Sequence, residues 1–253
     1  MTMHFTSAPH LSDGVIEREF VVGGVPGVLW TPVSASPDTP VPLVLLGQPG
    51  GFGLQRMRSR LAGRARACAA QGFAAVAIEL PGAGERTPLA GAAEARADLV
   101  RALDEARAPG DELIDRLILP LVDAAVPEWQ RTMDAVLALP EIGERVGISG
   151  GVIAVATRLA AVDPRIVAAG LFAGSYVPRA TFAEARRITI PVHVLLQWDD
   201  EGNDRAMALE LFDAFASSEK TLQANRGGHT GVPAFAADDA ARFFARHLGA
   251  ASG

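Results

Sequence analysis

The chain has 253 residues, of which 49% are apolar and 21% are charged, and its formal net charge is −6. Such a composition is typical of a globular protein with a substantial core. The acidic balance, without a basic patch, argues against a nucleic-acid-binding protein. No apolar run approaches the ~20 residues of a membrane span, so we expect no membrane association. Residues 1–14 lack the pattern of a signal peptide, which favours a cytoplasmic location.

The order of apolar and polar segments predicts one α/β domain over residues 1–253. Residues 1–14 are expected to be a loose tail. Strands are predicted at residues 16–22, 25–30, 43–46, 74–78, 145–148, 190–197 and 220–224, with one more ending at residue 173. Helices are predicted at residues 54–71, 92–108, 111–122, 127–139 and 233–248. This alternation predicts a mostly parallel sheet with helices on both faces.

More helix lies between residues 86 and 145 than one crossover between strands needs. Pro127 suits the first turn of a helix, so the helix at 127–139 is expected to be the ordinary crossover. The helices before it are expected to form a small lid inserted at about residues 88–126. Its apolar segment, residues 113–122, is expected either to line a substrate pocket or simply to be buried against the core.

A Gly-x-Ser-x-Gly pattern at residues 147–151 lies between a predicted strand and a helix of small residues. In that context the pattern predicts a nucleophile elbow, in which a strained, sharp turn lifts the hydroxyl of Ser149 clear of the sheet. A serine nucleophile needs a base within hydrogen-bond reach and an acid that orients the base. The pattern alone is weak in a chain with 26 glycines, so its value depends on an acid and a histidine later in the chain.

An acidic turn and a histidine loop come after the serine. The predicted strand at residues 190–197 ends in the turn that holds Asp199 and Asp200, and the last strand runs into a loop with His229. The other histidines lie in less suitable settings: His4 and His10 in the tail, His193 inside an apolar strand and His247 in the last helix. The resulting order is serine, acid, histidine.

With these motifs the chain resembles the α/β-hydrolases, within the branch of dienelactone hydrolase-like esterases. A glycine-rich loop at residues 47–53 and a Pro-Gly-x-Gly turn at residues 81–84 add to the resemblance, which spans about residues 16–248. It implies a catalytic triad of Ser149, Asp200 and His229, because the acid in this family usually lies a few residues past its strand. Asp199 is the second choice, and the remaining acids of the turn are weaker ones: Glu201 and Asp204.

An oxyanion hole needs two backbone N–H donors aimed at the developing negative charge. The resemblance implies Gly150 as one donor, and the loop at residues 47–53 as the source of the other. Pro49 occupies a position of this loop where the family often has a different residue. Proline has no backbone N–H, so Pro49 cannot be the second donor and Gly50 is the better candidate. Gly51 and Tyr176 are expected to contact the substrate. A dinucleotide-binding loop is excluded, because Arg56 occupies the position of its third glycine.

The leading interpretation is therefore a serine hydrolase that cleaves a carboxylic ester, lactone or thioester of a small molecule. Two alternatives stay open: a lyase or cyclase on the same fold, and a ligand-binding member without catalysis. No metal-ligand spacing is present, so we expect neither a metal nor an organic cofactor. Cys68, the single cysteine, is expected to be inert. The sequence does not determine the oligomeric state.

Overall fold

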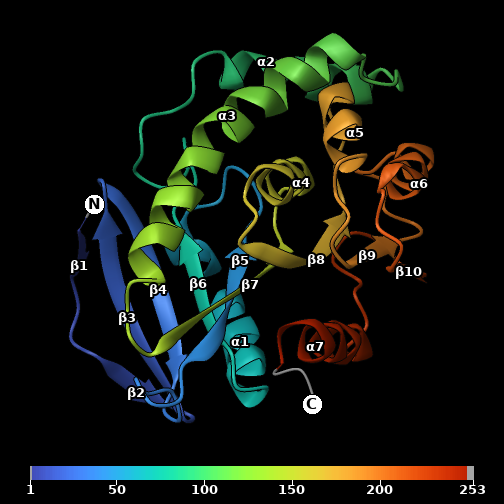
Figure 1. The fold of residues 1–253 in the computed structure, drawn as a ribbon. Helices are drawn as coiled ribbons and strands as arrows, with labels where there is room; N and C mark the ends of the chain where they lie inside the picture. The colour runs from blue at the N-terminus through green and yellow to red at the C-terminus, as the bar shows by residue number, and fades with distance from the viewer. Residues whose placement is uncertain (1, 250–253) are drawn as a thin grey trace.

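The computed structural model describes residues 2–249, which form a ten-stranded sheet flanked by seven helices (Figure 1). The strands are β1 Met3–Phe5, β2 His10–Ser12, β3 Val15–Val22, β4 Val25–Pro32, β5 Val41–Gly47, β6 Ala74–Ile78, β7 Ile142–Gly150, β8 Ile166–Ala173, β9 Val192–Gln197 and β10 Lys220–Asn225. The helices are α1 Leu54–Ala70, α2 Ala92–Asp104, α3 Asp111–Val136, α4 Ile153–Val162, α5 Arg179–Ala185, α6 Arg205–Ala214 and α7 Phe235–Leu248.

The sheet order is β1-β3-β4-β6-β5-β7-β8-β9-β10, and β2 pairs with the same edge of β3 as β1. Pairing is parallel from β6 to β10 and antiparallel among the first strands up to the β4–β6 pair. Every residue of β6 is buried, as expected for a parallel strand covered on both faces. The predicted fold class is confirmed.

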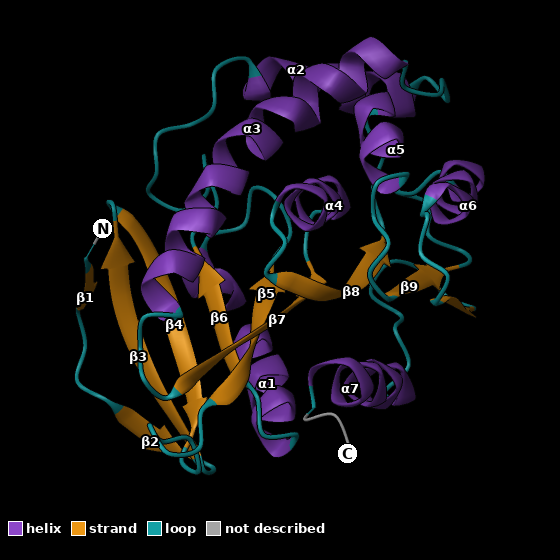
Figure 2. Ribbon diagram, viewed as in Figure 1, coloured by secondary structure: helices purple, strands orange, loops and turns teal. Residues whose placement is uncertain are grey.

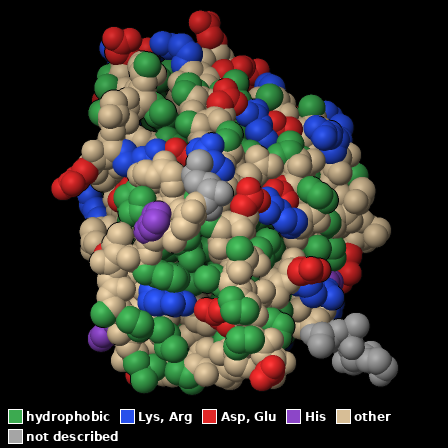
Figure 3. Space-filling model, turned by 60° about the vertical axis from the view of Figure 1, so that its left-hand side comes forward, with side chains coloured by type: hydrophobic (Ala, Val, Ile, Leu, Met, Phe, Trp, Pro, Cys, Tyr) green, Lys and Arg blue, Asp and Glu red, His purple; other side chains and the backbone are tan. Residues whose placement is uncertain are grey.

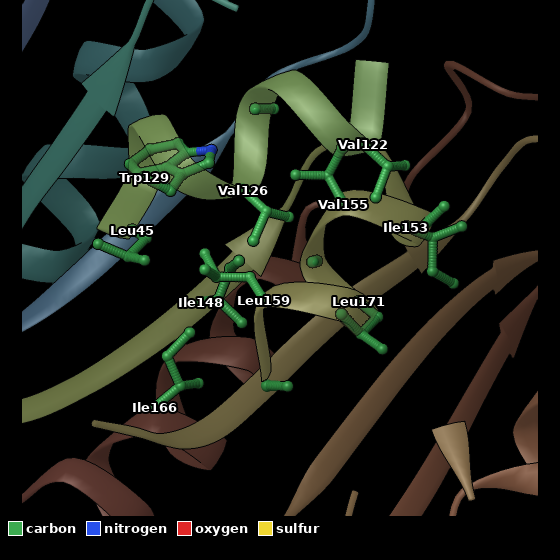
Figure 4. Close-up of a cluster of buried hydrophobic side chains, with 14 of the residues drawn as sticks. Leu45, Val122, Val126, Trp129, Ile148, Ile153, Val155, Leu159, Ile166 and Leu171 are labelled. Carbon is green, nitrogen blue, oxygen red and sulfur yellow. The ribbon is translucent and has the colours of Figure 1, made fainter. Parts of the chain in front are cut away.

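Two hydrophobic cores lie on opposite faces of the sheet (Figure 2). Helices α1 and α7 cover one face, whereas α3, α4, α5 and α6 cover the other. Figure 4 shows how the core on the side of α3 to α6 joins β5, β7 and β8 to helices α3 and α4. Because strand side chains alternate between faces, Ile148 points into this core and its neighbours in β7 point toward α1 and α7.

The prediction of two helices at residues 111–122 and 127–139 is wrong. One continuous helix, α3, runs through Pro120 and Pro127 (Figure 1). A proline inside a helix removes one backbone hydrogen bond. Here burial of Val122 and Val126, between the prolines, and of Trp129, after them, offsets that loss. The predicted insertion at residues 88–126 thus comprises α2 and the first part of α3, and its role as a lid stays a prediction.

The prediction of a loose tail at residues 1–14 is also wrong, although residue 1 lies outside the described part. Strands β1 and β2 pair antiparallel with β3. Their side chains are mostly exposed, so no apolar pattern in the sequence signalled them. Backbone hydrogen bonds to the edge of β3 hold them, together with a bond from the Glu19 N–H to Ser7 Oγ (2.9 Å).

The face of the molecule drawn in Figure 3 carries basic and acidic side chains interspersed among hydrophobic ones. In the described residues, no helix combines the length and apolarity that a membrane crossing needs.

Candidate active site

The side chains predicted to be catalytic lie where parallel strands end. Ser149 is the second-last residue of β7, Asp200 follows β9, and His229 lies in the loop between β10 and α7. In open α/β sheets, ligands bind beyond the carboxyl ends of the strands. The chain therefore brings its three predicted catalytic residues to the same edge of the sheet.

Asp200 and His229 form a hydrogen-bonded pair. Asp200 Oδ2 lies 2.7 Å from His229 Nδ1, and Asp200 Oδ1 accepts a hydrogen bond from the Gly202 N–H at 2.9 Å. The Asp200 side chain is only 1% exposed, whereas that of His229 is 51% exposed. A neutral imidazole that donates its Nδ1–H to the carboxylate leaves Nε2 free to accept a proton. The pair has the geometry of a base oriented by a buried acid.

Two neighbouring residues brace the loop that carries His229. Asp199, the second choice for the acid, accepts a hydrogen bond from the Gly227 N–H through Oδ2 at 3.0 Å. Buried Gln197 donates from Nε2 to the Gly228 carbonyl at 3.1 Å. The two consecutive aspartates thus have different contacts, one with the imidazole and one with the backbone of its loop.

The ring of His229 packs against the end of β8. Phe172 meets it edge-on, with ring centroids 5.2 Å apart. Gly174 leaves room for the imidazole, because a Cβ at this position would lie 2.9 Å from His229 Cε1. No local motif signalled that this glycine shapes the site.

The turn at the serine differs from the prediction. Strand β7 continues through Ser149, and the left-handed conformations fall on Gly150 (φ 64°) and Gly151 (φ 84°) instead of on the serine. Glycine adopts these angles without the steric cost that a Cβ brings, so the two glycines make the turn one residue later. Ser149 therefore keeps the strand alternation and shares the side of Gly147, which faces α7.

The hydroxyl of Ser149 contacts an arginine of α1. Arg64 Nη2 donates to Ser149 Oγ at 3.2 Å and to the Ser149 carbonyl at 2.5 Å, and Arg64 Nη1 donates to the Gly47 carbonyl at 2.7 Å. Within residues 2–249, no hydrogen bond joins Ser149 Oγ to His229 and no carboxylate pairs with Arg64. Burial lowers the pKa of Arg64.

Sequence reasoning missed Arg64, although a signal exists. The residue lies three positions after Leu61 and next to Ala65, both fully buried on the face of α1 that packs against the sheet. An arginine beside such a stripe has to find buried polar partners. Four residues further on, burial raises the pKa of Cys68 to about 11, so this thiol is neutral at pH 7.

The glycine-rich loop after β5 lies against the turn at Gly150 and Gly151. Gly47 and Gly151 approach so closely that a Cβ on Gly151 would lie 2.6 Å from Gly47 Cα. Gly50 packs near Leu121 of α3, and Gly51 (φ 79°) packs against Arg96 of α2.

A crevice of about 10 Å³ lies beside this loop. Its lining includes Gln48 and Gly150 together with Trp129 of α3, and it does not include Gly50. Gln48 is buried and donates from Nε2 to the Ile78 carbonyl at 3.1 Å, while its Oε1 has no partner in the described part of the chain. A space of this size holds about one water molecule.

Other expectations concern residues away from the crevice. Tyr176 is half-buried just after β8, where burial, and to a lesser extent the Asp204 carboxylate, raises its pKa. His193 is a buried structural residue, as predicted, with Nδ1 2.8 Å from Thr221 Oγ1. Among residues 2–249, no three His, Cys, Asp or Glu side chains are grouped as metal ligands.

The sheet order and the covering helices define an α/β-hydrolase fold. Neither a protein-family model nor a curated protein matches the chain. Solved structures do match. A cold-adapted esterase from an Arctic intertidal metagenomic library has 26% sequence identity and a TM-score of 0.74, and the match covers 97% of this chain and 99% of that one.

Two more distant structures share the fold. The acetyl xylan esterase of Paenibacillus sp. R4 has 17% identity and a TM-score of 0.68, with 97% of this chain and 89% of that one covered. A putative dienelactone hydrolase from Klebsiella pneumoniae subsp. pneumoniae has 19% identity and a TM-score of 0.60, with 90% of each chain covered. The chain thus resembles dienelactone hydrolase-like esterases, as the sequence indicates.

Proposed function

We propose that this protein is a serine hydrolase that cleaves a carboxylic ester, lactone or thioester through an acyl-enzyme. The observation that carries the proposal is the Asp200–His229 hydrogen bond, at the sheet edge where Ser149 lies at the end of β7. The esterase likeness at 26% identity supports ester hydrolysis as the reaction.

In the proposed reaction, His229 Nε2 takes the proton of Ser149 Oγ as the oxygen attacks the acyl carbonyl. Asp200 keeps the imidazole in the required tautomer and stabilises the imidazolium. The Gly150 N–H stabilises the oxyanion of the tetrahedral intermediate. The imidazolium then gives its proton to the leaving alcohol or thiol, and water releases the acid by the same steps in reverse.

The reaction requires Ser149 Oγ to exchange its contact with Arg64 for one with His229. That contact is 3.2 Å long, at the outer limit of ordinary hydrogen bonds, so its loss costs little. Gly150 and Gly151 give the backbone beside the serine the freedom for such a shift.

The predicted lid also enters the proposal. Leu121 Cδ2 would lie 3.2 Å from a Cβ on Gly50, so α3 lies directly over the loop after β5. Since the crevice holds about one water molecule, we propose that residues 88–126 move to admit an acyl group.

The test is intact-mass analysis after reaction with a fluorophosphonate probe. Wild type should gain one adduct, whereas Ser149→Ala and His229→Ala should gain none. Ser175→Ala, which alters a serine just beyond β8, is the matched control and should label like wild type. A folded wild-type protein that takes no adduct would contradict the proposal and favour the ligand-binding alternative.

A further inference from the structure

We propose that an open cleft beside the loop of His229 is a subsite for the sugar ring of a carbohydrate ester. The cleft has a volume of about 360 Å³, and its lining residues are Trp198, Asp199, Ala224, Asn225 and Arg226. The inference rests on the proposed serine hydrolase and names the class of alcohol that this enzyme releases.

The cleft adjoins the acid–base pair. Trp198 and Asp199 directly precede Asp200 in the chain. Arg226 comes three residues before His229, and an extended chain advances at most about 3.6 Å per residue, so their Cα atoms lie within about 11 Å of each other. In the proposed reaction the imidazole gives its proton to the leaving alcohol. The alcohol part of the ester therefore has to lie next to His229, within reach of the cleft.

Hydrogen bonds hold the two walls of the cleft together. The Trp198 N–H donates to the Asn225 carbonyl at 2.7 Å, and the Asp199 N–H donates to the Gly227 carbonyl at 3.2 Å. The Gly227 N–H in turn donates to Asp199 Oδ2 at 3.0 Å. The cleft is thus formed before a ligand binds, which lowers the entropy cost of binding.

Trp198 gives the cleft an aromatic surface. The residue is 40% exposed, whereas large aromatic side chains are mostly buried in a folded chain. The Arg205 guanidinium stacks on the indole at 4.4 Å from the ring centroid, and its Nη1 donates to the Trp198 carbonyl at 3.0 Å. The arginine orients the indole, and the exposed part of the ring remains free to pack against the C–H face of a sugar.

Two side chains of the cleft offer hydrogen bonds to a ligand. Asn225 Nδ2 contacts Gln197 Oε1 at a long 3.4 Å, and its Oδ1 accepts no hydrogen bond within residues 2–249. The Arg226 side chain is 90% exposed, and its ion pair with Asp199 is 3.6 Å long. An amide both donates and accepts, and a guanidinium donates. Neighbouring hydroxyls of a sugar ring, which also do both, match this pair.

The charges around the cleft favour an uncharged ligand. The turn after β9 carries Asp199, Glu201 and Asp204, which oppose an anionic ligand. Arg205 and Arg226 oppose a cationic one. An aliphatic alcohol would leave the polar side chains without partners, whereas a sugar ring is uncharged and has both an apolar face and hydroxyl groups.

The first experiment measures binding without turnover, in Ser149→Ala. Two of the three tryptophans, Trp30 and Trp129, are buried, so a ligand-induced change in emission reports on Trp198. Methyl glucoside or methyl galactoside should change the emission in a saturable manner. Trp198→Phe in the same background should abolish the change. A flat titration with both glycosides overturns the proposal.

The second experiment compares glucose monoacetate with ethyl acetate, which has the same acyl group but no ring. Trp198→Ala should raise the KM of the sugar ester about 3–10-fold more than that of ethyl acetate, the usual effect of losing one aromatic contact. Phe5→Ala is the matched control, because Phe5 is an exposed aromatic residue that also stacks with an arginine, at the far edge of the sheet. It should match wild type with both esters.

Equal changes in KM for the two esters would show that Trp198 only supports the loop of His229, and would overturn the proposal. A larger rise with phenyl acetate than with glucose monoacetate would overturn it in favour of an aromatic alcohol. If Trp198→Ala does not fold, Arg226→Ala replaces it, because that side chain is 90% exposed, and the same comparison decides. Wild type that takes no fluorophosphonate adduct contradicts the serine hydrolase itself, while the emission titration still reports on the cleft, so the two failures are distinguishable.

Discussion

The candidate site has two halves that differ in how they are assembled. The acid–base half consists of Asp200 and His229, which already share a 2.7 Å hydrogen bond. The serine half consists of Ser149, Arg64 and Gly47, in which the hydroxyl contacts the arginine of α1. Under the proposed mechanism, the acid–base half already has the arrangement that catalysis needs, whereas the serine half requires its hydroxyl to change partner.

The difference comes from the backbone that carries each group. Asp200 and His229 lie in loops, whose side chains are free to meet once neighbouring strands end together. Ser149 is still part of a strand, so the alternation of side chains sets its direction. The position of the turn relative to the serine, more than the sequence motif, therefore determines which partner the hydroxyl finds.

The largest effect is expected in the acid–base half, from Asp200→Asn. An amide in place of the acid favours the wrong imidazole tautomer, which costs about 10⁴-fold in kcat in the serine proteases. Asp199→Asn is the matched control, because an amide oxygen can still accept the hydrogen bond from the Gly227 N–H. It should lose less than about tenfold. Equal losses in kcat/KM for the two variants would contradict the assignment of the acid.

The next effect concerns the position of the imidazole. A Cβ added in Gly174→Ala would collide with the Phe172 ring and lie 2.9 Å from His229 Cε1, so the imidazole must shift. A displacement of about 1 Å can cost about 10²-fold in rate, which should appear in kcat. Gly63→Ala is the control, because a Cβ at Gly63 meets nothing within 4 Å. Unchanged turnover by a folded Gly174→Ala would show that the base tolerates displacement.

A third prediction concerns the stability of the protein near the serine half, where α3 lies over the loop after β5. Arg86 forms a two-pronged ion pair with Glu128 of α3, at 2.8 and 2.6 Å, and also donates to the Glu79 carbonyl. Glu128→Gln leaves the mostly buried guanidinium without its carboxylate. We expect a loss of about 2 kcal/mol, less than for a fully buried pair, which lowers the melting temperature by roughly 4–8 °C.

The exposed Glu112 of the same helix provides the control for that measurement. Glu112→Gln should change the melting temperature by much less than Glu128→Gln. Similar melting temperatures for both variants would show that the Arg86–Glu128 ion pair does not hold α3 to the segment after β6.

The smallest effect is expected from Glu79→Gln, which also supports the serine half. Glu79 Oε1 accepts a hydrogen bond from the Leu54 N–H at 2.8 Å, at the start of the helix that carries Arg64. Burial raises the pKa of Glu79 above its usual 4.5, so folding favours the protonated acid. Its stabilising contribution is therefore complete below pH 4.5 and is lost as pH rises through the folded pKa.

Melting curves against pH measure this contribution. Glu79→Gln, which cannot ionise, should match wild type near pH 4 and gain on it by a few degrees as pH rises toward 7. A difference that is constant over this range would contradict a titrating Glu79.

The fold was predictable because buried parallel strands leave a strong apolar signal, as the residues of β6 do. The meeting of Asp200 with His229 follows from loops at the same sheet edge. Three features were not predictable from local patterns. The helix through Pro127 depends on tertiary burial, and the strands before residue 14 depend on an edge to pair with. The contact of Ser149 with Arg64 depends on where β7 ends.

The pairing of β1 and β2 with β3 has a consequence for handling the protein. An uncovered edge strand offers its free N–H and C=O groups to another chain and promotes aggregation. Residues 3–12 occupy that position along β3. Deleting this short segment as a dispensable tail would uncover the edge of β3 and make the protein more prone to aggregation.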